Sequence, residues 1–150
     1  MRSEREERPE NRDGVPVEAG RSQSTGRLLL LLVDVVAYSR MMSIQQLQSV
    51  RLLHDVWREA GCPDAKGMFS PPRSPISIGD GFIFAGEDKA SVAEAFFNYI
   101  QSLCTRLDAL PQQDRFSVRF AAHSGDCWII EDNILGSGVN DLCRFAQCAV

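Results

Sequence analysis

The sequence predicts an α+β domain with a ferredoxin-like βαββαβ core. Three observations carry this prediction: a continuous apolar run that suits a buried central strand, an Asp-Gly turn between two short apolar runs, and an amphipathic helical pattern on each side of this hairpin. With 150 residues, of which 44% are apolar and 24% charged, the chain is long enough for one domain with a sizeable core. The expected order of elements is strand, helix, hairpin, helix, strand, strand and helix.

The first half of the chain supplies the first strand, the first helix and the hairpin. Residues 27–36 (RLLLLLVDVV) form the apolar run, which is typical of a strand buried on both faces. Residues 37–61 carry apolar side chains at helical spacing, and Gly61 is placed to end that helix. The arms of the hairpin are residues 75–78 (PISI) and 81–86 (GFIFAG).

The second half supplies the remaining helices and strands. Residues 87–110 begin with acidic side chains and continue as an amphipathic helix. Residues 115–124 (RFSVRFAAHS) and 126–132 (DCWIIED) are predicted as two strands joined at Gly125. A final helix is expected to begin near Val139 and to run to the end of the chain.

The domain is expected to span residues 27–150. Residues 1–26 are rich in Arg, Glu, Gly, Pro and Ser and hold almost no large apolar side chain. Such a segment cannot bury enough surface to offset the entropy lost on ordering. We therefore predict a disordered N-terminal tail.

Composition excludes several classes of function. The net charge of −4 argues against a nucleic-acid-binding surface, which depends on basic contacts to phosphate. The five cysteines form no CxxC pair, and His54 and His123 add no zinc-like spacing. The run LLLLLV is far shorter than the roughly 20 residues of a membrane helix, and the first ten residues contain no apolar signal-peptide core. We expect no membrane segment and a cytoplasmic protein.

Two acidic residues are candidates for metal chemistry. Asp34 ends the first strand, and Asp80 occupies the hairpin turn. In a ferredoxin-like sheet the first strand lies beside the strand that leaves the hairpin, so the two carboxylates could project toward one point. Paired carboxylates favour a cation between them, and ligation by oxygen alone favours magnesium or manganese. The alternative is that Asp34 caps the following helix and Asp80 is only a turn residue.

Four segments together resemble a known family. VDVVAYS, IGDGFIF, VRFAAHSG and LGSGVNDLCR are similar to the metal, hairpin, strand and helix motifs of the class III nucleotidyl cyclase catalytic domain, of the bacterial type. They occur in the family's order and at similar intervals across residues 27–150. The resemblance implies the class III cyclase fold, whose core is the ferredoxin-like arrangement predicted above. It also implies a lyase that converts a nucleoside triphosphate to a 3′,5′-cyclic nucleotide and pyrophosphate for intracellular signalling.

The resemblance also implies a metal site with a phosphate-binding turn. Asp34, Asp80 and the backbone carbonyl of Val35 match the positions that hold two Mg²⁺ or Mn²⁺ ions. The turn of Ala37, Tyr38 and Ser39, together with Val36, matches the segment whose backbone N–H groups face the β- and γ-phosphates. Ala37 stands where the family usually has Gly, a mild departure if its φ is negative. Arg119 matches a phosphate-contacting arginine; its alternative is a solvent-facing strand residue.

A second group of residues would come from a partner chain. Asn140 and Arg144 match the pair that positions the ribose and stabilises charge on the α-phosphate, and their i, i+4 spacing puts them on one helical face. An ordinary pair of helix residues is the alternative. His123 matches a family histidine that we interpret as structural. In the family one protomer gives the aspartates and the other Asn and Arg, so a homodimer with composite sites is implied.

Two departures from the family pattern bear on substrate and completeness. Ile76 and Asn133 stand where adenylate cyclases carry a Lys and an Asp that read adenine, and they do not form the Glu and Cys pair that reads guanine. A neutral amide bonds either kind of base edge. The family also continues past the final helix with two more strands, which are missing from this chain.

Three functional hypotheses follow. The first is a nucleotidyl cyclase with ATP as the commonest family substrate, or with a pyrimidine triphosphate, as in cyclases of bacterial antiphage signalling. The second is a cyclase-like module that binds nucleotide or a partner and regulates without catalysis. The third is another ferredoxin-like metal or polymerase-palm domain, which shares the two acids but does not predict the helix that carries Asn140 and Arg144.

Overall fold

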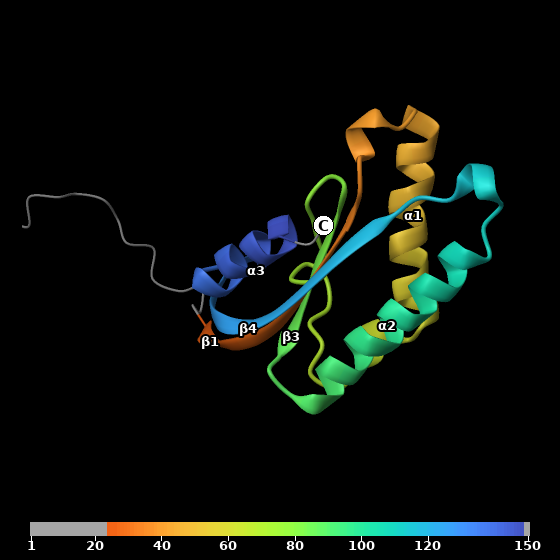
Figure 1. Ribbon diagram of the computed structural model, residues 1–150. Coiled ribbons are helices and arrows are strands. Elements are labelled where there is room, and N and C mark those ends of the chain that lie inside the picture. The colour runs from red at the N-terminus through yellow and green to blue at the C-terminus, as the bar shows by residue number, and fades with distance from the viewer. Residues whose placement is uncertain (1–23, 149–150) are drawn as a thin grey trace, which may run out of the picture.

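The computed structural model describes residues 24–148 of the chain (Figure 1). The strands are β1 (Ser24–Val35), β2 (Ile76–Ser77), β3 (Gly81–Glu87), β4 (Val118–Ile130) and β5 (Asn133–Leu135). The α-helices are α1 (Ser43–Glu59), α2 (Ala90–Asp108) and α3 (Ser137–Cys148), and short 3₁₀ turns lie at Tyr38–Arg40, Cys62–Asp64 and Gln112–Asp114. No helix in this part of the chain is long and apolar enough to cross a membrane.

The five strands form one antiparallel sheet in the order β2-β3-β1-β4-β5. The first four positions of this order are those of a ferredoxin-like sheet, so the predicted α+β fold is confirmed. Helices α1 and α2 cover one face of the sheet, and α3 covers the other (Figure 1). Strand β1 lies at the centre and pairs with β3 on one side and β4 on the other.

The apolar run in β1 feeds a core on each face of the sheet. Leu31 and Val33 point toward α1 and α2, where the ring of Trp57 stacks on Phe84 with centroids 3.9 Å apart. Leu30 and its alternate neighbours point toward α3. Side chains alternate along a strand, so both sets must be apolar when both faces are covered. The run is continuous for this reason.

The prediction of two strands joined at Gly125 was wrong. Strand β4 runs without a break from Val118 to Ile130, and Gly125 pairs with Leu28 of β1. A Cβ atom at Gly125 would lie 2.8 Å from the Cα of Gly138 in α3. The glycine therefore allows a close approach of the helix, which is a common role of glycine within a strand. The actual turn follows at Glu131, whose φ is 54°.

Three element boundaries also differ from the prediction. Strand β1 begins at Ser24 instead of residue 27, because the long β4 continues to pair with it. The expected disordered tail otherwise lies in residues 1–23, outside the described residues. Helix α1 begins only at Ser43, and α3 begins at Ser137, two residues before the expected start. Gly61, with a φ of 68°, follows α1 and its cap as predicted.

Candidate active site

The register of the sheet places three residues of the predicted site in one row. Asp34 near the end of β1 lies between Gly81 of β3 and Arg119 of β4. Asp34 is on the same sheet face as Leu32, which packs toward α3, because side chains two residues apart share a face. The end of the buried strand thus brings a carboxylate and a guanidinium together.

The side chains of Asp34 and Arg119 form a bidentate ion pair. Nε of Arg119 donates to Oδ1 of Asp34 at 3.1 Å, and Nη2 donates to Oδ2 at 2.6 Å. The Asp34 side chain is 9% exposed and the Arg119 side chain 36%. The hydrogen bonds and charge of Asp34, and to a smaller extent the charge of Asp80, raise the pKa of Arg119. Arg119 therefore balances the charge of Asp34 within the sheet, and Asp34 does not cap a helix.

The hairpin turn brings Asp80 to the same place. The carbonyl oxygen of Asp80 accepts a hydrogen bond from the backbone N–H of Val35 at 2.9 Å. A Cβ atom at Gly81 would lie 1.9 Å from the carbonyl oxygen of Val33, so only glycine fits beside β1 here. Gly79 has a φ of 94°, which allows the turn to close. The turn itself consists of Gly79 and Asp80, whereas Gly81 is the first residue of β3 and lets two strands approach closely.

A cleft of about 430 Å³ lies beside this row of residues. Six of the residues that line it were predicted as site residues, namely Val35, Ala37, Tyr38, Ser39, Asp80 and Arg119, and the other two are Ile78 and Gly79. The turn before α1 is held there by a hydrogen bond from the N–H of Val36 to the carbonyl of Ser117 at 2.9 Å. The structure thus joins the predicted phosphate-binding turn, one aspartate and the predicted phosphate-contacting arginine in one cleft.

The sign of φ at Ala37 decides how large a departure this alanine is from the glycine of the family pattern. Its φ is +57° and its ψ is 28°, which is the left-handed region. An alanine there has its Cβ close to the following carbonyl oxygen, a strain that glycine avoids. The replacement of glycine by alanine is therefore a larger departure from the family pattern than the one that a negative φ would have made.

The two positions that would contact the base lie in different strands. Ile76 of β2 pairs with Ile83, and the register continues this row through Leu32 to Ala121. This row is two residues, about 7 Å, from the row of Asp34, on the same face of the sheet. Asn133 lies at the start of β5 and is exposed. The structure does not bring Asn133 into the cleft that Asp80 and Arg119 line.

Asn140 and Arg144 lie on α3 and are exposed. Nη1 of Arg144 lies 3.5 Å from Oδ1 of Asp141, whose other oxygen is 3.9 Å from Nε2 of His123. His123 is four residues from Arg119 along β4, about 13 Å in an extended strand. Among the described residues, no hydrogen bond or ion pair connects Asn140 or Arg144 to the acids of the cleft.

The ring of His123 also packs edge-on against Phe145, with centroids 5.3 Å apart, as expected for a structural histidine. Asp141 is a residue that the sequence analysis missed. Its i, i+3 spacing to Arg144 was the signal that could have identified it.

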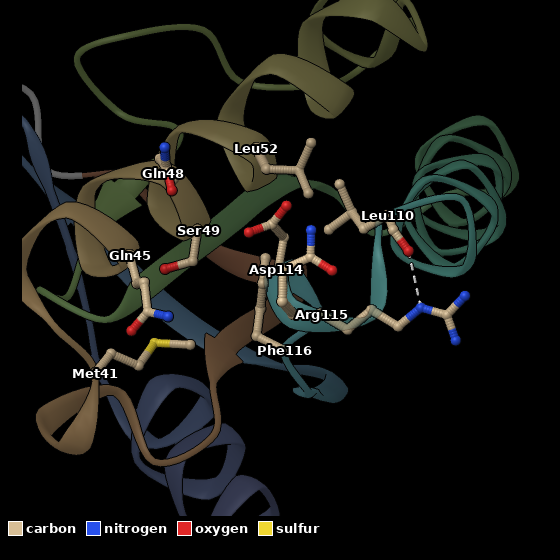
Figure 2. A pocket seen from close by; sticks show the side chains of 10 residues that line it. Met41, Gln45, Gln48, Ser49, Leu52, Leu110, Asp114, Arg115 and Phe116 are labelled. Atoms are coloured by element: carbon tan, nitrogen blue, oxygen red, sulfur yellow. Dashed lines mark hydrogen bonds between the residues drawn. The ribbon is translucent and has the colours of Figure 1, made fainter.

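A second cavity, of about 270 Å³, lies between α1 and the loop that precedes β4 (Figure 2). Met41, Gln45, Leu52 and Phe116 are among its lining residues. Figure 2 shows that Arg115 turns toward the carbonyl oxygen of Leu110, to which its Nε donates at 2.9 Å. None of the predicted site residues lines this cavity. It is separate from the candidate site.

The chemistry of the cleft fits a hard divalent cation. Asp34, Asp80 and the carbonyl of Val35 offer only oxygen atoms, which Mg²⁺ and Mn²⁺ prefer. The described residues contain no cluster of three or more His, Cys, Asp or Glu side chains placed for a metal ion. A site here therefore depends on two carboxylates, on backbone oxygen, and on a ligand that supplies the remaining oxygen atoms.

Solved structures with the same arrangement are catalytic domains of cyclases. The catalytic core of a rhodopsin-guanylyl cyclase with converted specificity, in complex with ATPαS, matches with a TM-score of 0.63 at 14% identity, over 87% of this chain and 76% of that one. The adenylate/guanylate cyclase/hydrolase of Silicibacter pomeroyi matches with a TM-score of 0.61 at 19% identity, over 85% of this chain and 72% of that one. The chain has the class III cyclase fold.

A third example with the cyclase fold is the monomeric guanylyl cyclase domain of the RhoGC fusion protein from Blastocladiella emersonii. It matches with a TM-score of 0.60 at 14% identity, over 87% of this chain and 80% of that one. No family model matches the chain, and a sequence search among curated proteins also gives no match. At these identities the likeness establishes the cyclase fold, and the chemistry has to be argued from the site.

Proposed function

We propose that this domain is a nucleotidyl cyclase, which converts a nucleoside triphosphate to a 3′,5′-cyclic nucleotide and pyrophosphate in intracellular signalling. The observation that carries the proposal is the position of the acids. Asp34 at the end of β1 and Asp80 on the adjoining turn lie beside Arg119 in a cyclase fold. The expectation of a cytoplasmic protein is part of this proposal.

The predicted site residues in and beside the cleft have distinct roles in the proposed reaction. Asp34, Asp80 and the carbonyl of Val35 would hold two Mg²⁺ or Mn²⁺ ions, which would neutralise phosphate charge and favour attack by the ribose 3′ oxygen on the α-phosphorus. Backbone N–H groups of Ala37, Tyr38 and Ser39 and the guanidinium of Arg119 would bind the β- and γ-phosphates. These contacts would align the pyrophosphate as the leaving group.

The second half of the site would come from another copy of the chain. Asn140 would position the ribose, and Arg144 would stabilise charge on the α-phosphate in the transition state. Both are exposed on α3, and among the described residues neither forms a hydrogen bond or ion pair with Asp34 or Asp80. This separation supports a homodimer in which each site combines one copy's acids with the other copy's helix.

The identity of the substrate base is a more detailed part of the proposal. Ile76 is apolar and packs against the core beneath α3, so it offers a base no hydrogen bond. Asn133 offers one amide, whose Oδ1 accepts from the N–H of Ile134 at 2.9 Å. ATP remains our first candidate, as the commonest substrate of the family, and a pyrimidine triphosphate is the alternative. Of the similar structures, one contains ATPαS and a guanylate cyclase domain from Catenaria anguillulae contains GTP.

A second candidate function is a cyclase-like module that binds nucleotide and regulates without catalysis. The observation that favours it is the engagement of both Asp34 oxygens by Arg119, together with the strained turn at Ala37. A metal ligand already committed to an arginine is less available for catalysis.

One experiment separates the two candidates. The purified protein is incubated with Mn²⁺ and each of the four nucleoside triphosphates, and cyclic products are measured by mass spectrometry, with Asp80→Ala as the matched inactive variant. A cyclic product from the wild-type protein alone would support the enzyme. Nucleotide binding without product, unchanged in Asp80→Ala, would support the regulatory module.

A further inference from the structure

Arg119 stands between Asp34 and the cleft. The cleft is lined by Asp80 and Arg119, whereas Asp34 is 6% exposed and is not among the lining residues. A ligand that enters the cleft therefore meets the guanidinium before it meets the carboxylate of Asp34.

The ion pair engages both oxygens of the carboxylate. Both oxygens of Asp34 accept from Arg119, and among the described residues no other side chain bonds them. The backbone register holds the two residues directly opposite each other on β1 and β4. On the β3 side, Gly81 has no side chain that could replace the arginine. Asp34 thus has a cation of its own within the fold.

We infer that Arg119 is the resident counter-cation of Asp34 and competes with a divalent cation for this carboxylate. This inference rests on the proposed function, since it concerns the same site. Two carboxylates and one guanidinium carry a net charge of −1, and withdrawal of the guanidinium leaves −2, which attracts a divalent cation more strongly.

Arg119 is able to leave because more than a third of its side chain is exposed. The fork of donors that binds a carboxylate also binds a phosphate. A triphosphate in the cleft therefore offers Arg119 another partner, and binding of the nucleotide and of the cation at Asp34 support each other.

The test measures binding of Mn²⁺ alone to the full chain, from the loss of the electron paramagnetic resonance signal of free Mn²⁺. We expect Arg119→Gln to bind Mn²⁺ about 10- to 100-fold more tightly than the wild-type protein. This is the range expected when charge-assisted hydrogen bonds to Asp34 no longer compete with the cation. Arg106→Gln is the matched control, because it removes the same charge from an Arg–Glu59 pair between α1 and α2. Equal tightening in both variants would show a general effect of charge and overturn the inference.

A second variant covers the case in which Arg119→Gln does not fold. Arg119→Lys keeps the positive charge but cannot bond both oxygens of Asp34 through a planar fork. We expect it to bind Mn²⁺ more tightly than the wild-type protein, and unchanged affinity would contradict competition by the bidentate pair. Thermal melting identifies which variants are folded.

Two further outcomes separate this inference from the proposed function. If Asp34→Asn abolishes Mn²⁺ binding while Arg119→Gln leaves the affinity unchanged, the metal site stands and the competition is wrong. If neither the wild-type protein nor any folded Arg119 variant binds Mn²⁺, both the metal site and the inference fail. Tighter binding in Arg119→Gln without cyclic product from any triphosphate would retain the inference and reject the enzyme.

Discussion

Two of the Arg–Asp pairs among the described residues differ in almost every respect. Arg119 and Asp34 come from adjacent strands, approach to 2.6 Å and bond through two atoms on each side, and the Asp34 side chain is 9% exposed. Arg144 and Asp141 are three residues apart on α3 and approach to 3.5 Å, and the Arg144 side chain is 76% exposed. The first pair is part of the sheet, and the second lies on the surface.

This difference in burial determines how readily each arginine can leave its aspartate. Breaking a buried pair leaves a charge with little water and no partner, so Arg119 is held unless a ligand replaces it. An exposed pair is weak because water already solvates both charges. Arg144 can therefore turn toward a ligand or a second copy of the chain at little cost. The same residue type is a structural cation at one place and an available one at the other.

The largest difference between the two regions is expected in catalysis. If the domain is a cyclase, Asp80→Asn removes a charge beside Arg119 and the proposed metal ions. We expect the rate of cyclic product formation to fall about 10²- to 10³-fold, as it does when one electrostatic contact to a transition state is lost. Asp141→Asn, the matched change at the exposed pair, is expected to change the rate by less than about threefold. Initial rates of product formation give both values, and similar losses would contradict this division.

The next effect concerns the close approach of strands at the Asp34 end. Gly81→Ala places a Cβ atom against the carbonyl of Val33, and we expect a loss of about 3 kcal/mol in the free energy of unfolding, since the backbone must shift. Gly79→Ala meets nothing within 4 Å and is expected to lose only about 1 kcal/mol, from its positive φ. Urea unfolding checks both, and an equal loss would mean that the contact at Gly81 relaxes easily.

A direct comparison of the two pairs follows from their burial. Arg119→Met leaves Asp34 without a partner, and we expect it to lower the free energy of unfolding by about 2–3 kcal/mol, with part of the charge still reached by water. Arg144→Met is expected to change it by less than about 0.5 kcal/mol. Urea unfolding at low and high salt measures both values. The comparison fails if Arg144→Met costs as much as Arg119→Met.

The smallest effect is expected at the turn beside the buried pair. Ala37→Gly removes the strain of a left-handed alanine but increases the entropy of the unfolded chain, so we expect a net stabilisation of about 0.5 kcal/mol. Thermal unfolding of the variant beside Ala65→Gly, whose φ is −65°, provides the control, and that change is expected to destabilise. Destabilisation by Ala37→Gly would show that the strain is negligible.

Sequence patterns predicted the fold better than its boundaries. The apolar run, the Asp-Gly turn and the helical spacing are local signals, and together they led to the correct sheet order. The break expected at Gly125 was wrong because a glycine within an apolar pattern can mark either a turn or the close approach of a helix. Only the position of Gly138 in α3 decides between these two roles. The start of β1 was placed late because pairing with β4 extends it.

Most residues of the cleft were named from the sequence, but their contacts with one another were not. Asp34 and Asp80 were expected to meet, and Arg119 was expected to face phosphate or solvent. That Arg119 bonds Asp34 depends on the register of β1 against β4, since a shift of one residue would turn the arginine to the other face. No spacing in the sequence contains this register, because 84 residues separate the two partners.

The sequence by itself determined most of the elements and the residue types of the proposed site: a buried strand that ends in an acid, a turn that carries another, and a helix with Asn140 and Arg144. These are local properties of hydrophobic period and turn chemistry. Only the tertiary structure decided which charges are paired. It buried Asp34 against Arg119 and left Arg144 exposed, because the register of the sheet and the close approach at Gly81 arise from packing between distant segments.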